Sequence, residues 1–326
     1  MNKKLNIAIL FGGNSSEKII SEYSSHTIAR YLPTDKYSAY RVAVSHNLWT
    51  VELDGNHIDV DKNDFSFTHS GTKIVFDCAY IIIHGTPGEN GLLQAYFEIL
   101  NIPYTSCNSF VSALTFDKYA CKCYLRDLGV KLSQDILLRP NETAHDLPYP
   151  LFVKPNAGGS SFGVSKVHSA ENLQPAIDAA FAEGAGNVLL ETFIAGVEFS
   201  HGIFITHNRT LEFPVTQIIS ETDFFDYTAK YEGKSKEITP ANIPDLLANR
   251  IRQETRRIAA YLGCHGLVRI DYIYSNDELY FLEINTVPGM SEASLVPQQI
   301  VKAGYSVAQI LDFLVEDSIS RTKTQK

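Results

Sequence analysis

The feature that most constrains the fold is a short apolar run near the N-terminus that ends in two glycines. Residues Leu5–Phe11 read LNIAILF, and Gly12 and Gly13 follow directly. A strand that is apolar on both faces is typical of a parallel sheet covered by helices. The glycines favour a tight turn, and a serine just after them can cap a helix that runs towards Leu32. We therefore predict that the chain begins as an α/β unit.

The rest of the first third repeats this pattern. Tyr37–Val44 alternates like a strand, Cys78–Ile83 is a second buried strand, and Gly91–Leu100 reads as a helix. Together these segments predict a doubly wound parallel sheet, whose ligand site should lie at the carboxyl ends of the strands. We expect residues 1–108 to form this N-terminal α/β domain.

The rest of the chain has a different texture, with glycine-rich turns and longer β segments. We predict helices from Ser112 to Gly129 and from Pro244 to Leu262, and two more beyond Ser294. We predict strands over 151–155, 164–167, 187–193, 198–205 and 210–218, then a hairpin over 267–274 and 278–285. Residues 219–241 are polar and aromatic without a clear period, and a loop of that length is usually functional or disordered. We expect domains over 109–195 and 196–326, with 219–241 as a lid.

Composition excludes several classes of function. A net charge of -9 and a pI near 5.6 argue against nucleic acid as the main partner, because a phosphate-binding surface needs an excess of Lys and Arg. The five cysteines are odd in number and lack C-x-x-C spacing, which favours a reduced, cytoplasmic location without a zinc site. No apolar run approaches the roughly 20 residues of a membrane helix.

The hairpin carries the clearest chemistry. Arg269 and Asp271 are two residues apart and share one face of a strand, as Glu283 and Asn285 do on the returning strand. A three-residue turn around Asp277 would place the two carboxylates opposite each other. Carboxylate and amide oxygens suit Mg²⁺, which usually binds through one or two carboxylates plus phosphates and waters. The alternative is a surface charge ladder, which the apolar neighbours disfavour.

A loop rich in glycine and serine, residues 157–163, lies between two predicted strands. Its amides and hydroxyls can cradle phosphate oxygens. It is not a P-loop, because it lacks the G-K-[S/T] ending and a strand follows it. Lys154 lies on the apolar strand that enters the loop, and we interpret it as a phosphate ligand. A flexible hairpin and a salt-bridged edge lysine are the alternatives.

Other candidates lie at the ends of strands and helices. Glu17 opens the first helix and His84 ends a buried strand, so both should face one cleft at the sheet edge. Gly289 can bring an amide close to a reacting centre, and Ser294 begins a helix whose N-terminus favours a carboxylate. Each also has a structural alternative: a helix-dipole carboxylate, a buried histidine and a simple N-cap.

Taken together, the segments resemble the D-alanine–D-alanine ligases of the ATP-grasp superfamily from Phe11 to about Leu314. Each motif alone is weak or moderate, whereas their order and spacing are specific. The matching segments are FGGNSSE (11–17), HGTPGENG (84–91), ALTFDK (113–118), FVKPNAGGSSFG (152–163), ETFIAGVEF (191–199), DYTAKY (226–231), GLVRIDYIY (266–274) and LEINTVPGMSEASLVP (282–297). The resemblance implies an N-terminal parallel-sheet domain followed by a two-part ATP-grasp fold.

The resemblance also implies roles in binding ATP and metal ions. It implies Mg²⁺ or Mn²⁺, two ions when ATP is bound, held by Asp271, Glu283 and Asn285. Phosphate ligands are expected at Lys118 and Lys154, with Lys230 beside the phosphates. The expected nucleotide-binding residues are Ser160, Ser161, Glu191, Phe193, Ile194 and Glu198. In the segment from Glu191 to Glu198, backbone groups would meet the adenine and Glu198 would meet the ribose.

Further roles follow for the amino-acid substrates. The resemblance implies that Glu17 anchors the first D-alanine ammonium with His84 in the same subsite, and that Ser294 and Leu295 receive the second carboxylate. A Glu–Ser–Tyr network of Glu17, Ser160 and Tyr231 would close the site. Arg269 and the Gly289 amide would stabilise the tetrahedral intermediate. Phe162, where a smaller residue is common, and Phe193, at a variable aromatic position, depart slightly from the family pattern.

The activity implied is ATP-dependent joining of two D-alanines into a dipeptide for peptidoglycan synthesis, by a protein that forms homodimers in this family. Rivals are a ligase making D-alanyl-D-lactate or D-alanyl-D-serine, and a nucleotide- or amino-acid-binding protein without turnover. Tyr231 disfavours the lactate rival, because tyrosine at this lid position goes with D-alanine as second substrate. A Rossmann dehydrogenase is disfavoured by the missing G-x-G-x-x-G.

Overall fold

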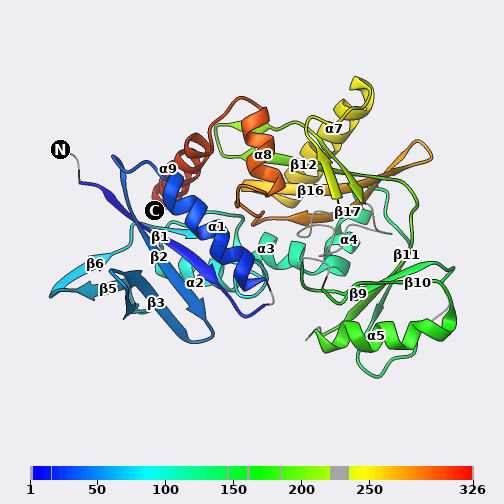
Figure 1. The fold of residues 1–326 in the computed structure, drawn as a ribbon, viewed down its shortest axis with the longest axis horizontal. Coiled ribbons are helices and arrows are strands. Elements are labelled where there is room, and N and C mark those ends of the chain that lie inside the picture. The colour runs from blue at the N-terminus through cyan, green and yellow to red at the C-terminus, as the bar shows by residue number, and fades with distance from the viewer. Residues whose placement is uncertain are drawn as a thin grey trace.

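The first sheet lies at one end of the molecule (Figure 1), and its strand β1 lies between β2 and β7. A computed structural model describes residues 3–15, 17–144, 147–159, 162–183, 186–220 and 235–324. The sheet order is β4-β3-β2-β1-β7, and β1 pairs in parallel with both β2 and β7. The strands are β1 (Leu5–Gly12), β2 (Tyr37–Ser45), β3 (Leu48–Leu53), β4 (Asn56–Asp59) and β7 (Cys78–Ile81). The predicted parallel core is therefore confirmed.

The sheet is mixed rather than wholly parallel, because β3 and β4 run antiparallel to their neighbours. The tight turn between β3 and β4 contains Asp54 and Gly55, both with positive φ, as a two-residue hairpin of this kind requires. A separate small hairpin, β5 (Ser66–His69) and β6 (Thr72–Val75), follows. The sequence pattern assigned no strand between 45 and 77, so these four strands are new.

Helices from both ends of the chain cover this sheet. Helix α1 (Lys18–Tyr31) packs on β1, and the last helix α9 (Val307–Thr324) packs against α1 and β7. Figure 1 shows α9 beside α1, with both chain ends on that side. Ile310, Leu311 and Val315 of α9 belong to the same buried cluster as the residues of β1. Helix α2 (Leu92–Leu100) agrees with the predicted helix.

The helix predicted from Ser112 to Gly129 is two helices, α3 (Ser109–Phe116) and α4 (Lys118–Arg126). Asp117 separates them with an extended backbone, and its Oδ1 accepts a hydrogen bond from the Ala120 N–H that caps α4. The break lets the Lys118 N–H donate to the Asn156 carbonyl at 3.0 Å. The start of α4 is thereby fixed to the glycine-rich loop.

Two antiparallel sheets form the remainder. The smaller has the order β10-β9-β11-β8 and is packed against helix α5 (Leu173–Ala182), which follows the short 3-10 helix Ala170–Asn172. Its strands are β8 (Asp135–Leu138), β9 (Leu151–Pro155), β10 (Ser165–Val167) and β11 (Val188–Thr192). Figure 1 shows this sheet and α5 at the opposite end of the molecule from β1.

The larger sheet has the order β15-β14-β12-β16-β17, with β13 paired to β12. The strand predicted over 210–218 is two strands, because Pro214 between them has no N–H for a ladder. Helix α7 (Asp245–Leu262) packs on β12, as does α8 (Leu295–Lys302). The strands are β12 (Val197–Ile205), β13 (Thr210–Glu212), β14 (Thr216–Ser220), β15 (Ser235–Ile238), β16 (Gly266–Ser275) and β17 (Glu278–Asn285).

The hairpin of β16 and β17 has the predicted pairing of Asp271 with Glu283, but its turn is shorter than predicted and its register shifts along the strands. Its turn has two residues, Asn276 and Asp277, both with positive φ, so the predicted three-residue turn is wrong. An irregularity between Asp271 and Tyr272 then shifts the register by one residue. The result places Asp271 opposite Glu283, as predicted. A bulge of this kind is a common means of re-aiming side chains near a site.

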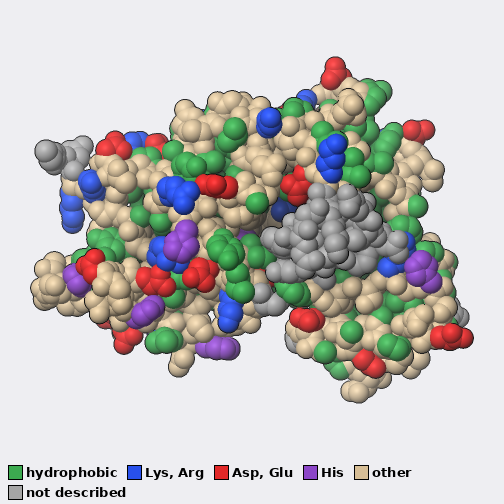
Figure 2. Space-filling view, viewed as in Figure 1, with side chains coloured by type: hydrophobic (Ala, Val, Ile, Leu, Met, Phe, Trp, Pro, Cys, Tyr) green, Lys and Arg blue, Asp and Glu red, His purple; other side chains and the backbone are tan. Residues whose placement is uncertain are grey.

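Acidic and basic side chains are interspersed on the face drawn in Figure 2. Among the described residues, no helix is both long enough and apolar enough to cross a membrane.

Candidate active site

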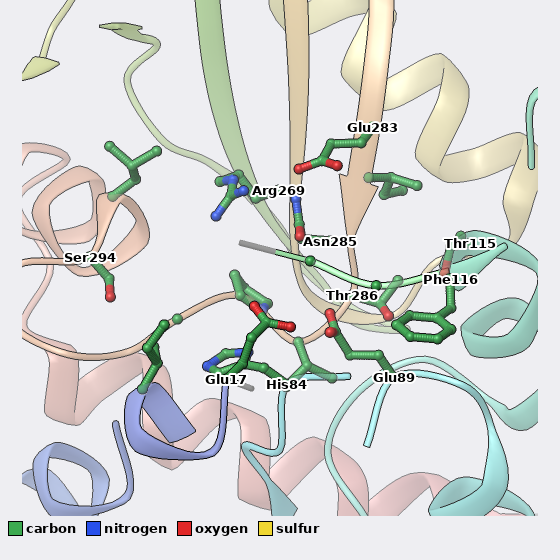
Figure 3. Close-up of a pocket in the computed structure, with 18 of the residues that line it drawn as sticks. Glu17, His84, Glu89, Thr115, Phe116, Arg269, Glu283, Asn285, Thr286 and Ser294 are labelled. Atoms are coloured by element: carbon green, nitrogen blue, oxygen red, sulfur yellow. The ribbon is translucent and has the colours of Figure 1, made fainter. Parts of the chain in front are cut away.

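A cleft lies where the first sheet, α3, α4 and the β16–β17 hairpin meet, and it encloses about 1220 Å³ including the part open to solvent. Figure 3 shows side chains from these separate elements pointing into it. The predicted site residues that line it are Glu17, His84, Lys118, Arg269, Glu283, Asn285, Gly289, Ser294 and Leu295. Residues far apart in sequence are thus brought to one place.

Glu17 and His84 form one end of this cleft. Both side chains are buried, and Ser15 Oγ donates to the His84 carbonyl at 2.9 Å, which joins the two segments. A Cβ at Gly159 would lie 2.8 Å from Glu17 Oε2, so the glycine-rich loop passes close to this carboxylate and a larger residue would displace it. Burial lowers the pKa of His84, and its Nε2 has no partner among the described residues. An orphaned polar atom in a cleft is a natural contact for a ligand.

Glu89 lines the same end of the cleft, although the sequence interpretation gave it no role. Its Oε2 accepts a hydrogen bond from the Gly85 N–H at 2.7 Å. Burial raises the pKa of Glu89 to about 8, and the nearby charge of Glu17 adds to the shift. Glu89 belongs to the segment HGTPGENG. Its position five residues after His84 is the sequence feature that could have indicated a place in the same cleft.

Glu89→Gln is expected to stabilise the fold more at alkaline pH than at acidic pH. The unfolded carboxyl releases its proton near its ordinary pKa of 4.5, whereas the folded one holds it up to about 8. The contribution of Glu89 to the free energy of unfolding therefore falls as the pH rises through this window. Urea unfolding of both proteins at about pH 5 and about pH 8 measures the effect. A difference between the two proteins that does not change with pH would contradict the assignment.

The carboxylate of Asp271 is buried behind Arg269. Arg269 Nη2 lies 2.7 Å from Asp271 Oδ2, and its Nε donates to Oδ1 at 3.0 Å. Ser200 Oγ donates to Oδ1 at 2.6 Å, and Asn285 Nδ2 lies 3.4 Å from Oδ2. Such charge-assisted bonds fix the guanidinium at the wall of the cleft.

The residues predicted to hold Mg²⁺ share one face of the hairpin. Two carboxylates, Asp271 and Glu283, pair across the strands, and Asn285 adds an amide oxygen beside them. These are hard oxygen donors of the kind that Mg²⁺ prefers. Within the part of the chain that the structure describes, no three His, Cys, Asp or Glu side chains gather as a metal site. The donor set fits the ion only when the amide and the phosphates of a nucleotide contribute.

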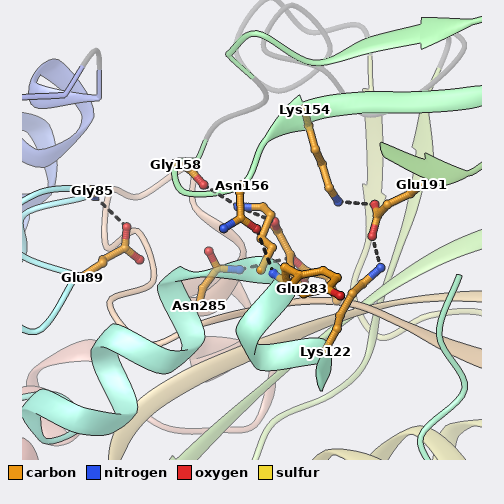
Figure 4. A network of polar contacts seen from close by, with 12 residues as sticks. Gly85, Glu89, Lys122, Lys154, Asn156, Gly158, Glu191, Glu283 and Asn285 are labelled. Carbon is orange, nitrogen blue, oxygen red and sulfur yellow. Dashed lines mark hydrogen bonds and ion pairs between the residues drawn. The ribbon is translucent and has the colours of Figure 1, made fainter. Parts of the chain in front are cut away.

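Two lysines expected to bind phosphate have protein partners in this structure. Lys118 Nζ donates to the Gly158 carbonyl at 2.5 Å and lies 3.9 Å from Glu283 Oε2. Lys154 Nζ lies 2.5 Å from Glu191 Oε2 (Figure 4). Lys154 and Asp271 do not line the cleft described above. The predicted residues Ser160, Ser161, Lys230 and Tyr231, and most of the predicted lid 219–241, lie outside the described residues.

The segment expected to contact the nucleotide base begins at the end of β11. Glu191 is buried on this strand, and Phe193 follows it with its ring 5.6 Å from that of Phe152. Ile194 lies in the turn, and Glu198 lies on β12 opposite Ile273. None of the four predicted residues of this segment is among those lining the cleft, so their roles stay predictions.

At the other end of the cleft, Gly289 approaches the start of α8. A Cβ on Gly289 would lie 2.8 Å from Ser294 Oγ, so a larger residue there would displace this hydroxyl. Ser294 occupies the N-cap position, yet its side chain makes no capping bond and meets Ser291 Oγ at 2.7 Å. Leu295, buried at the first helical position, completes this wall.

Comparison with known proteins places the whole chain in one family. Models of the D-ala D-ala ligase N-terminus and C-terminus match residues 6–107 and 129–316. A D-alanine–D-alanine ligase of Phocaeicola vulgatus is 45% identical, covering 96% of this chain and 99% of that protein.

Solved structures agree over nearly the full length. The crystal structure of the D-Ala:D-Ser ligase VanG from Enterococcus faecalis has a TM-score of 0.84 at 29% identity and covers 97% of this chain and 100% of that one. The D-alanine–D-alanine ligase of Bacillus anthracis complexed with ATP has a TM-score of 0.78 at 26% identity, covering 99% and 100%. The predicted α/β fold class is confirmed, and this chain belongs to the D-alanine–D-alanine ligase family.

Proposed function

We propose that this protein uses ATP to join two molecules of D-alanine into D-alanyl-D-alanine for peptidoglycan synthesis. The observation that carries the proposal is the cleft that brings Glu17, at the start of α1, to Arg269 and Asn285 of the β16–β17 hairpin. Family membership over the full chain supports it. The substrate would be held at its two charged ends, and the nucleotide phosphates would enter from the side of Lys118.

The reaction would proceed in two steps. A carboxylate oxygen of the first D-alanine, whose ammonium Glu17 holds, attacks the γ-phosphorus of ATP, and ADP leaves. The amine of the second D-alanine, after losing a proton, attacks the carbonyl carbon of the acylphosphate, and inorganic phosphate leaves. Arg269 and the Gly289 amide would stabilise the negative charge that develops on the carbonyl oxygen. The lid predicted over 219–241, most of which lies outside the described residues, would exclude water that would otherwise hydrolyse the acylphosphate.

Mg²⁺ would be held by Asp271, Glu283 and Asn285 together with the nucleotide. Mn²⁺ is an alternative, and two ions are expected with ATP. The bound ion supplies positive charge that neutralises the transferring phosphoryl group. The protein would hold the ion in place, because the hairpin fixes the Asp271 and Glu283 carboxylates opposite each other. Lys118, which lies 3.9 Å from Glu283, would add a second positive charge at the same place.

Glu283→Gln is expected to raise the Mg²⁺ concentration needed for half-maximal turnover by about tenfold or more, since one of two anionic ligands becomes a neutral amide. Titration of turnover with Mg²⁺ at saturating ATP and D-alanine measures the shift. Glu278→Gln, at the far end of the same strand, is the matched control. Equal Mg²⁺ requirements in the two variants would remove Glu283 from the metal site.

The first test is phosphate release from ATP and Mg²⁺ with D-alanine, L-alanine, or D-alanine plus D-lactate or D-serine, followed by mass analysis. Release that depends on D-alanine and yields the dipeptide is the expected result. An ester product would indicate a D-alanyl-D-lactate ligase. A D-seryl product would indicate a D-alanyl-D-serine ligase, which stays an alternative because the chain is similar to a D-Ala:D-Ser ligase. A folded, ATP-binding protein without D-alanine-dependent release would be a binding protein.

The remaining proposals rest on family likeness. Tyr231 lies outside the described residues, and Tyr231→Phe is proposed to raise the use of D-lactate as acceptor; an unchanged acceptor preference would contradict this. We also propose a cytoplasmic homodimer whose ATP lies between the domains at 109–195 and 196–326. Sedimentation velocity would test the dimer.

A further inference from the structure

A buried lysine with no assigned role lies next to the predicted nucleotide site. Lys122, on α4, is 1% exposed. Its Nζ donates to Ser133 Oγ at 2.8 Å, forms an ion pair with Glu191, and lies 3.6 Å from Asp135 Oδ2. A buried lysine is retained at a cost in desolvation, which its partners must offset. Lys122 is not among the residues lining the cleft, so any effect on ATP would act through another group.

That group is Glu191, whose carboxylate is shared by two lysines. Figure 4 shows Lys122 reaching one oxygen and Lys154 the other. The distance from Lys154 Nζ to Glu191 Oε2 is 2.5 Å, and both side chains are buried. Ser133 Oγ also lies 3.3 Å from Glu191 Oε1, on the side of Lys122.

The surrounding charges favour an incoming anion. Arg126 Nη2 binds Asp135 at 2.5 Å, and Asp135 lies opposite Glu191 on the neighbouring strand. Among the described residues, the cations Arg126, Lys118, Lys122 and Lys154 are thus close to the carboxylates Asp135, Glu191 and Glu283, an excess of one positive charge. Burial lowers the pKa of Lys122 to about 8 and lowers that of Lys154 as well. A bound polyphosphate would favour the charged form of these lysines.

We infer that Lys122 is a positioning residue: it keeps Glu191 paired so that Lys154 can turn from that carboxylate to a phosphate group of ATP. If Glu191 had Lys154 as its only cation, ATP would have to compete for that lysine and leave a buried carboxylate unpaired. Breaking a buried pair in this way is costly. With Lys122 in place, Glu191 keeps one ion pair in both states. This inference rests on the proposed function, because it takes ATP as the ligand of Lys154.

The test is Lys122→Met, which preserves much of the side-chain volume and removes the charge. We expect the KM for ATP to rise about tenfold, or about 1.4 kcal/mol in binding. The KM for D-alanine should not change, because Glu17 and Ser294 lie on other elements. Lys131→Met, which removes an exposed lysine 3.3 Å from Glu278, is the matched control and should leave both KM values unchanged.

Two further variants separate positioning from simple structural support. Lys122→Arg keeps the cation and should hold the KM for ATP within about threefold of the wild type. The double variant Lys122→Met/Glu191→Gln removes the charge that holds Lys154, so its KM for ATP should fall well below that of Lys122→Met. It removes one cation and one carboxylate together, so the buried cluster keeps its net charge and the variant should fold even if Lys122→Met does not. A KM for ATP that stays about tenfold raised in the double variant would overturn the inference.

An unchanged KM for ATP in folded Lys122→Met would also overturn it, as would an equal rise in both KM values. These outcomes differ from failure of the proposed function. In that case the wild-type protein itself would show no ATP turnover that depends on D-alanine, whatever residue 122 is.

Discussion

Replacing Arg269 by alanine is expected to lower kcat by about 10²–10³-fold, which is typical for loss of a preorganised donor to a developing oxyanion. The Arg269 guanidinium is fixed by bonds of 2.7 and 3.0 Å to buried Asp271, so it needs no reorganisation when charge appears in the cleft. Water that fills the space left by the side chain cannot reproduce this fixed charge. Phosphate release at saturating ATP, Mg²⁺ and D-alanine measures the loss.

Arg252→Ala is the control for this experiment, because half-buried Arg252 does not line the cleft and its Nη1 donates to Asn249 Oδ1 at 3.1 Å. Its kcat should match the wild type. The thermal midpoint of Arg269→Ala separates chemistry from folding, since buried Asp271 loses its guanidinium partner in that variant. An Arg269→Ala protein that is folded and retains more than about a tenth of wild-type kcat would contradict the assigned role.

Gly88→Ala is expected to cost about 3 kcal/mol of folding free energy and to raise the KM for D-alanine. A Cβ at Gly88 would lie 2.0 Å from the Ile83 carbonyl oxygen and 2.6 Å from Ile83 Cβ. Ile83 is fully buried, so neither partner can move without shifting the strand end that carries His84. Urea unfolding measures the first effect and steady-state kinetics the second.

Gly186→Ala provides the comparison for this variant, because a Cβ there would meet nothing within 4 Å. The change should alter the free energy of unfolding by less than about 1 kcal/mol. If the two alanine variants unfold at the same urea concentration, the contact between Gly88 and Ile83 does not limit the fold.

The sequence predicted the pairing of residues within the hairpin well, because side-chain alternation depends only on local geometry. It placed Asp271 opposite Glu283, although the turn has two residues and a bulge supplies the shift. The shorter turn and the bulge each shift the register by one residue, in opposite directions. The pairing of Asp271 with Glu283 is therefore the same as in a hairpin with a three-residue turn and no bulge, so the predicted pairing could reveal neither feature. Asp117 is a second example of a feature that the sequence pattern could not reveal. The helical pattern around it predicts one long helix, whereas its Oδ1 accepts a hydrogen bond from the Ala120 N–H and caps a second helix.

The sequence alone could not predict ion pairs between residues that are far apart in the chain. Lys122 reads as one more polar position on a helix, and only the packing of α4 against β8 and β11 buries it beside Glu191. The antiparallel strands between 45 and 77 were missed because they have only four to six residues each, and β4 and β6 are largely exposed. The predicted site residues that line the cleft were found because they lie in the family motifs, whereas Glu89, although it lies in the motif HGTPGENG, needed the structure to reveal its surroundings.

The packing of α9 against α1 and β7 has a consequence for synthesis on the ribosome. Ile310, Leu311 and Val315 fill the core of a sheet whose first strand is made about three hundred residues earlier. The emerging N-terminal segment therefore keeps an apolar surface exposed until the final helix has left the exit tunnel. Chains that stop before Val307 would present that surface permanently, so premature termination should yield aggregated or degraded protein rather than a partly active fragment.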